Sequence, residues 1–261
     1  MRILVTNDDG IEAEGLWALA QAMSELGPTL IVAPEHTQSG VGTSVTLRRA
    51  MNICEVESRV PGVRAYSVDG TPGDCVILGL RRVAKERITL LVSGVNAGAN
   101  VGNEILVSGT VGATWQGYFR GLNSMAVSLD LQRHPGAPLY TEAARVAKAL
   151  VQRLSDRIPS GFLLNMNVPN IRLENIAGVA LTRVARGAYF KLDDVGEGSA
   201  RSYQSTLRTD LAPPEHTDMW ALVNDMVSIT PLEGDLSDHA LIQALHPTAD
   251  ELLRDLRGAP A

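Results

Sequence analysis

The sequence is poor in aromatic residues and in long apolar runs, and each shortage excludes a class of protein. Aromatic residues make up 4% of the 261 residues while hydrophobic residues make up 45%, so the core must rest on Val, Leu, Ile and Ala. This composition is typical of a parallel sheet covered by helices on both faces. No apolar run reaches membrane-spanning length, and the first residues lack the apolar centre of a signal peptide. We expect a cytoplasmic protein with no membrane partner.

Positive charge and cysteine are also scarce. The chain has 23 Lys and Arg against 29 Asp and Glu, a net charge of -6, which argues against non-specific nucleic-acid binding. A small phosphate ligand remains compatible, because a bound metal supplies positive charge locally. Cys54 and Cys75 form no zinc or CxxC spacing, so we expect buried free thiols in a reducing compartment. The five histidines also lack metal-binding spacing.

Apolar segments alternate between strand-like and helix-like patterns over roughly residues 1–130. This alternation predicts an α/β fold with a doubly wound, mostly parallel sheet of the Rossmann-like kind. The predicted strands cover residues 2–6, 30–33, 65–68, 88–92 and 125–129, and the predicted helices residues 16–23, 72–83, 110–119 and 141–154. Residues 45–57 are β-prone and suggest a hairpin.

From about residue 159 the pattern changes to a β-rich C-terminal extension. We expect strands at residues 162–168, 179–184 and 226–230, and a short helix at 249–257. The chain as a whole, residues 1–261, is interpreted as a single domain. Residues 187–210 are polar and irregular and show no buried periodic face, so we interpret them as an arm that makes oligomer contacts.

Polar residues follow several of the predicted strands, and ligands of open α/β sheets bind at that edge. The sharpest feature is Asp8-Asp9, directly after the first strand. Two adjacent buried carboxylates repel each other, and a hard divalent cation such as Mg²⁺ or Mn²⁺ removes the conflict. The alternative is a solvated turn in which one aspartate caps the following helix.

Three further segments offer ligand groups at the same edge. Residues 93–103 are rich in Gly and Asn, and Asn96 and Asn100 bring amide groups for a metal or a phosphate; the alternative is a flexible connection. Ser108-Gly109-Thr110 opens a helix, whose free N–H groups either bind phosphate or are simply capped. Ser39 follows the second strand and offers a hydroxyl ligand, although a lone loop serine is usually only solvated.

Taken together, these motifs resemble the SurE family of stationary-phase survival proteins, which are 5′/3′-nucleotidases. The matching stretches lie in order between residues 3 and 239 and are ILVTNDDGIEAEGL, VAPEHTQSGVGTSVTL, YSVDGTPGDCVILGL, LVSGVNAGANVGNEILVSGTVGATWQG, LLNMNVP and VSITPLEGDLSDH.

The resemblance implies one divalent metal ion per subunit, held by Asp8, Asp9, Ser39 and Asn96. It implies phosphate contacts near Asn96, Asn100 and Ser108-Gly109-Thr110, and homodimers or homotetramers built partly by exchanged C-terminal segments. The sequence departs from the family pattern at Val107, at Gln116 and across residues 187–210. These departures concern base selectivity and oligomer contacts and leave the metal positions intact.

The resulting hypothesis is a metal-dependent phosphomonoesterase that hydrolyses nucleoside 5′-monophosphates, and 3′-monophosphates as a possible second class. Asp8 and Asp9 are the expected catalytic residues, and one of them orients or deprotonates the attacking water. The haloacid dehalogenase class needs an Asp nucleophile where this chain has Asn7, and a receiver module needs an Asp where Ser93-Gly94 stand. The alternative is a regulatory module that binds metal and nucleotide without turnover.

Overall fold

The computed structural model describes residues 1–155, 161–187, 189–195, 202–208, 210 and 212–257. In this part of the chain the main sheet has the strand order β3-β4-β2-β1-β5-β6-β7-β11-β8. The bounds are β1 Ile3–Thr6, β2 Thr29–Pro34, β3 Ile53–Val56, β4 Arg64–Val68, β5 Leu90–Ala97, β6 Asn123–Asp130, β7 Leu163–Pro169, β8 Gly178–Leu181 and β11 Met226–Leu232. A separate antiparallel pair joins β9 (Phe190–Asp194) to β10 (Tyr203–Leu207).

The centre of the sheet is parallel, as predicted. β1 pairs in parallel with β2 on one side and β5 on the other, and β6 and β7 continue the parallel run. Antiparallel pairs occur toward the edges, between β3 and β4 and between β7 and β11. Because the chain leaves β1 toward β2 and later returns to β5, the loops after β1 and β5 diverge around a topological switch point.

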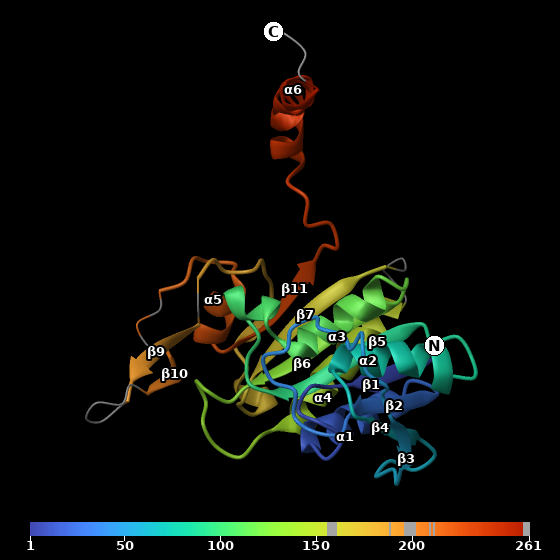
Figure 1. Cartoon of the computed structure of the whole chain (residues 1–261). Helices are drawn as coiled ribbons and strands as arrows, with labels where there is room; N and C mark the ends of the chain where they lie inside the picture. The colour runs from blue at the N-terminus through green and yellow to red at the C-terminus, as the bar shows by residue number, and fades with distance from the viewer. Residues whose placement is uncertain (156–160, 188, 196–201, 209, 211, 258–261) are drawn as a thin grey trace.

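Helices cover both faces of the sheet (Figure 1). Helices α1 (Glu14–Ser24) and α4 (Tyr140–Ser155) pack on the face that carries Ile3 and Val5. Helices α2 (Pro72–Leu78) and α3 (Gly109–Tyr118) cover the opposite face. The strands are apolar on both faces because each face meets helices, and this explains how a chain with few aromatic residues builds its core.

Three predictions for the first half of the chain were wrong in detail. Residues 45–57 do not form a hairpin: only β3 is a strand, and it pairs with β4. Residues 93–103 were predicted as loop, yet β5 continues to Ala97 with a register shift between Ser93 and Asn96. A bulge lets the Gly-containing segment remain in the sheet. Cys75 is buried as expected, whereas Cys54 is exposed, and both are free thiols.

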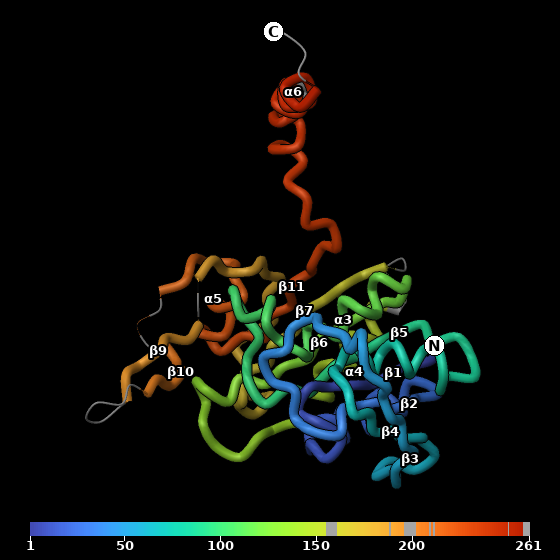
Figure 2. The backbone as a smooth tube through the Cα atoms, viewed as in Figure 1, coloured from blue at the N-terminus to red at the C-terminus, as the bar shows by residue number. Residues whose placement is uncertain are grey.

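The C-terminal extension contains more regular structure than its sequence pattern predicts. The segment 187–210 holds the β9–β10 pair, which projects from the body (Figure 2). Residues 188, 196–201 and 209 of that segment, and the expected change of pattern near residue 159, lie outside the described residues. The short helix α5 (Asp218–Val223) was not predicted. Among the described residues, no helix combines the length and apolar character needed to cross a membrane.

The last helix, α6 (His239–Leu256), starts ten residues before the predicted helix at 249–257 and stands away from the body (Figure 1). Asp238 caps it, accepting a hydrogen bond from the Leu241 N–H at 2.9 Å. Pro247 lies inside the helix, and a proline normally ends one, which explains why the sequence pattern favoured a later start.

Candidate functional site

The loop after β1 presents Asp8 and Asp9 at the carboxyl edge of the sheet. Asn7 shapes this loop from inside, because its Nδ2 donates to the Gly10 carbonyl at 2.9 Å and its Oδ1 accepts from the Gly10 N–H at 3.2 Å. The Asp8 carbonyl accepts from the Gln38 N–H at 2.7 Å, which holds the loop after β2 against this turn. The two loops therefore meet at one point on the sheet edge, as predicted.

The N-terminus of α3 faces Asp8. The Thr110 hydroxyl donates a hydrogen bond to Asp8 Oδ1. Ser108 is the N-cap of α3, and its Oγ accepts from the Val111 N–H at 3.1 Å. Gly109 lies so close to the carboxylate that a Cβ there would be 2.8 Å from Asp8 Cβ, so only glycine allows this approach. The structure thus brings Ser108, Gly109 and Thr110 to Asp8.

Burial makes the acidic pair electrostatically costly without a counter-ion. Asp8 is 5% exposed, and burial together with the neighbouring Asp9 charge raises its pKa to about 6, although hydrogen bonds from Thr110 oppose the shift. Burial also raises the pKa of Asp9, against the opposing effect of the Ala97 N–H. A divalent cation would relieve the cost of ionising both carboxylates.

The end of β5 lies beside Asp9. The Ala97 N–H donates to Asp9 Oδ2 at 3.2 Å, and the Asp9 carbonyl accepts from the Thr37 hydroxyl at 3.0 Å. Asn96 is half-buried, and its Nδ2 donates to the Gly98 carbonyl at 2.7 Å. This bond engages the amide nitrogen of Asn96, so the Oδ1 oxygen is the atom suited to a hard cation.

Asn100 is buried in an amide network that the sequence analysis missed. Its N–H donates to Asn167 Oδ1 at 2.8 Å, and its carbonyl accepts from the side chains of Asn165 and Asn167. Its own Nδ2 donates to the Ser128 hydroxyl at 2.8 Å. The polar side chains of the LLNMNVP segment were the available signal, since a strand buried on both faces is normally apolar. Asn100 is firmly held, with one amide N–H remaining for an anion.

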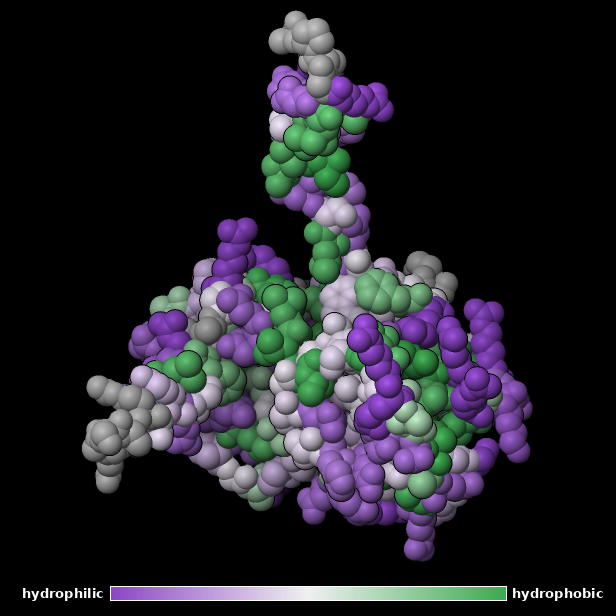
Figure 3. All heavy atoms as spheres, viewed as in Figure 1, coloured by the Kyte–Doolittle hydropathy of each residue, from purple (hydrophilic) through white to green (hydrophobic). Residues whose placement is uncertain are grey.

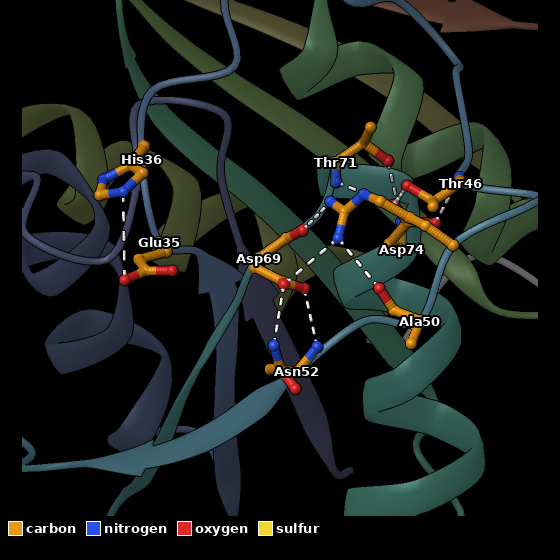
Figure 4. A network of polar contacts seen from close by, with 9 residues as sticks. Glu35, His36, Thr46, Ala50, Asn52, Asp69, Thr71 and Asp74 are labelled. Atoms are coloured by element: carbon orange, nitrogen blue, oxygen red, sulfur yellow. Dashed lines mark hydrogen bonds and ion pairs between the residues drawn. The ribbon is translucent and has the colours of Figure 1, made fainter.

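Ser39 lies in the loop between β2 and β3, and it is exposed. Buried or half-buried aspartates anchor this loop farther along (Figure 4). Asp74 accepts from the Thr46 N–H at 2.9 Å, and Asp69 accepts from the Asn52 N–H at 2.7 Å. These bonds explain why residues 45–52 form no strand, because side chains satisfy their backbone groups.

Charge, and not the size of a cavity, identifies this region. A cavity of about 350 Å³ is lined by Ile11, Glu12, Trp17 and other residues, and one of about 260 Å³ lies at the opposite ends of the strands; neither contains a candidate site residue. No group of three or more His, Cys, Asp and Glu side chains suited to a metal occurs within the described residues. A metal at this edge would therefore bind two carboxylates together with neutral oxygen atoms.

Comparison with known proteins now adds to this geometry. The model of the family described as "Survival protein SurE" matches residues 3–191. The chain belongs to the SurE family. A SurE relative from Dehalococcoides mccartyi is 39% identical over 238 residues, covering 90% of both chains. Another, from Vibrio parahaemolyticus, is 37% identical over 255 residues, covering 94% of this chain and 93% of the relative. Both relatives are named 5′-nucleotidase SurE.

The fold agrees with a solved SurE structure. The crystal structure of the SurE protein from Aquifex aeolicus superposes with a TM-score of 0.83 at 32% sequence identity, covering 95% of this chain and all of that one. The SurE resemblance seen in the motifs is therefore confirmed, and so is the α/β fold.

Proposed function

We propose that this chain is a nucleotidase that hydrolyses nucleoside 5′-monophosphates to nucleoside and phosphate with the help of one divalent cation. Membership of the SurE family supports the nucleotidase activity. The observation that carries the site is the adjacent pair at the carboxyl end of β1, with Asp8 buried against the start of α3 and Asp9 half-buried beside it. Hydrolysis of 3′-monophosphates belongs to the same proposal, because the cation, Asn100 and the start of α3 would bind the phosphate group and not the sugar position.

The residues at this edge fit a hard cation such as Mg²⁺ or Mn²⁺. Every candidate ligand atom is an oxygen: the carboxylates of Asp8 and Asp9, the Asn96 Oδ1 and the Ser39 hydroxyl. Burial raises the pKa of Asp8 and of Asp9, so ionising both carboxylates has a cost that a bound cation would offset. When bound, the cation supplies charge neutralisation for the phosphate and helps to activate water.

The chain's own residues would position the reacting groups. The Thr110 hydroxyl holds Asp8 by one oxygen and so orients its carboxylate. Asp9 is half-buried and accepts a single hydrogen bond of the described set, from the Ala97 N–H, so its carboxylate can accept a proton from an attacking water. The first N–H groups of α3 and the Asn100 amide would hold the phosphate oxygens and stabilise the charge of the transition state.

The test is phosphate release from a panel of nucleoside 5′- and 3′-monophosphates with Mn²⁺, with and without chelator. We expect release that chelator abolishes, and a fall of at least about a thousandfold in kcat for Asp8→Asn, because an electrostatic contact in the transition state is lost. A wild-type protein that binds a nucleotide and Mn²⁺ but releases no phosphate would favour the regulatory alternative. Wild-type turnover by Asp8→Asn would refute the site assignment.

A homo-oligomer and a cytoplasmic location are further parts of this proposal. The apolar residues Leu241, Ile242, Leu245, Leu252, Leu253 and Leu256 of α6 are exposed, and Figure 3 shows apolar side chains on this detached helix. A second copy that covers them would form a dimer or tetramer. Light scattering should show a smaller particle for Leu241→Glu/Leu245→Glu but not for the α6 control Gln243→Glu. The two free thiols suit a reducing cytoplasm.

A further inference from the structure

The loop between β5 and α3, residues 98–108, joins the two groups of candidate phosphate-binding residues. Asn100 lies near its start, and Ser108 at its end begins α3. None of the proposed site residues lies in the C-terminal extension. Even so, the extension contacts this loop at several points, and we call residues 98–108 the connecting loop.

Asp218 makes the most buried of these contacts. This carboxylate is fully buried at the first residue of α5. Its Oδ2 accepts from the Gly102 N–H at 2.9 Å, and its Oδ1 accepts from the N–H groups of Ala185 and Met219 at 2.9 and 2.8 Å. One side chain therefore ties the connecting loop to both the segment before β9 and the start of α5.

Packing supports the same link. Ala99 and Val101 of the connecting loop share a hydrophobic cluster with Tyr189, Met219 and Leu222 of the extension. Gly102 has φ +55°, and a Cβ there would lie 2.7 Å from the Gly187 carbonyl oxygen. The loop thus fits against the extension only because residue 102 has no side chain.

Two more polar contacts also join the connecting loop to the C-terminal extension. The Asn103 N–H donates to the Gly187 carbonyl at 3.1 Å. Glu104 Oε1 accepts from the Tyr189 N–H at 2.8 Å, next to the start of β9. All of these anchors come from residues that follow the loop by more than 80 positions in sequence.

We propose that Asp218 is a positioning residue, which fixes the connecting loop so that Asn100 and the start of α3 hold the phosphate in place. This rests on the proposed function. A displacement of about 1 Å in a group that holds the substrate can reduce turnover about a hundredfold, so the precision of this anchor matters for catalysis.

Asp218→Asn isolates the contact to the loop. The substitution keeps the shape of the side chain but leaves one acceptor oxygen. If that oxygen stays with the N–H groups of Ala185 and Met219, the new amide N–H₂ faces the Gly102 N–H, and two donors oppose each other. We call the hydrogen bonds of the Asp218 carboxylate the clamp. The change therefore weakens the bond of the clamp to Gly102 more than its bonds to Ala185 and Met219.

Thr217→Val is the matched control. Thr217 caps α5, and its Oγ accepts from the Trp220 N–H at 3.2 Å, with no hydrogen bond to the connecting loop among the described contacts. The control destabilises the same helix and leaves the Asp218 carboxylate unchanged. Glu104→Ala, which removes the acceptor of the Tyr189 N–H, is a second test of the loop's attachment at a less buried position, should Asp218→Asn fold poorly.

The measurements are hydrogen exchange of residues 98–108, kcat and KM for 5′-AMP with Mn²⁺, and the Kd of Mn²⁺. For Asp218→Asn we expect faster exchange in the connecting loop and a kcat/KM about ten- to a hundredfold lower. The Kd of Mn²⁺ should change by less than about threefold, because Asp8 and Asp9 lie on another loop. Thr217→Val should keep the wild-type kcat/KM.

Wild-type exchange and wild-type kcat/KM in both Asp218→Asn and Glu104→Ala would overturn the proposal. An equal loss of kcat/KM in Thr217→Val would also overturn it, because the effect would then be general destabilisation of α5. If the wild-type protein releases no phosphate at all, the proposed function fails, whereas the exchange comparison still decides whether Asp218 orders the loop.

Discussion

Asp8, of the Asp8–Asp9 pair, and Asp218 are both buried acidic residues, but their surroundings differ. Burial raises the pKa of Asp8 to about 6 and also raises the pKa of Asp218. Asp218 receives three backbone N–H donors, which belong to Gly102, Ala185 and Met219. Asp8 receives the Thr110 hydroxyl and has a second carboxylate as its neighbour. The environment of Asp218 completes a structural contact, whereas the environment of Asp8 leaves negative charge for a ligand.

This difference separates a carboxylate that holds the fold from one that holds a substrate. The backbone donors around Asp218 would be left without an acceptor if the carboxylate were removed, so the fold depends on it. The Asp8–Asp9 pair costs the metal-free fold free energy, because two neighbouring carboxylates are ionised in a buried place. A raised pKa alone does not distinguish the two cases, whereas the set of donors does.

The largest expected effect is that an Asp→Asn substitution changes the stability in opposite directions at Asp8 and at Asp218. In metal-free protein at pH 8, Asp8→Asn should raise the free energy of unfolding by up to about 3 kcal/mol, since it removes an ionised group whose pKa is about 6 when folded. Asp218→Asn should lower it by about 1–3 kcal/mol, because a buried donor loses its acceptor. Urea denaturation with chelator measures both, and shifts in the same direction would break the comparison.

The next effect is the pH dependence of stabilisation by Mn²⁺. The Asp8 pKa rises from 3.8 to about 6 on folding, so the stability that protonation contributes is complete below the lower value and is lost as pH rises through about 6. Mn²⁺ binds the ionised form, so one unit below that pKa its affinity should be about tenfold weaker. The rise in Tm on adding Mn²⁺ should thus be larger at pH 8 than at pH 5. Asp8→Asn, the control, should show a weaker dependence, because only Asp9 of the pair still titrates.

The smallest effect concerns Ser39. Its exposed hydroxyl would be a neutral ligand, so Ser39→Ala should lower kcat/KM by only about two- to fivefold and change stability by less than about 0.5 kcal/mol. Ser44→Ala, in the same loop and also exposed, is the control and should match the wild type. A loss in Ser39→Ala as large as that in Asp8→Asn would mean that the hydroxyl is a principal ligand.

The acidic edge can be predicted from the sequence, because the end of each strand in a parallel sheet can be recognised from a short segment of the chain. Asp8 and Asp9 follow an apolar run that can only be a strand, and strand ends converge at one edge. The same logic brought Asn96 and Thr110 to that edge. Residues 93–97 were harder to assign, because the Gly- and Asn-rich composition of residues 93–103 indicates a loop, whereas a bulge keeps residues 93–97 within β5.

The clamp could not be predicted from sequence in the same way. Asp218 and Gly102 are separated by 116 positions, and a single Asp before five apolar residues indicates only a helix start. The clamp depends on how the extension folds over the sheet, and that depends on distant packing. The first part of helix α6 was also not predicted, because Pro247 argued against a helix that begins before it.

Gly102 is anchored by Asp218, which lies in α5 near the C-terminal end of the fold, and this has a consequence for shortened forms of the chain. A fragment cut after β7 would retain Asp8, Asp9, Asn96 and Thr110, all the atoms suited to metal and phosphate, together with most of the parallel sheet. The fragment would nevertheless lack the Asp218 carboxylate, the acceptor that fixes the connecting loop. Premature termination between residues 170 and 218 should therefore lower turnover without removing the proposed metal-binding residues, and a minimal catalytic unit must extend through α5.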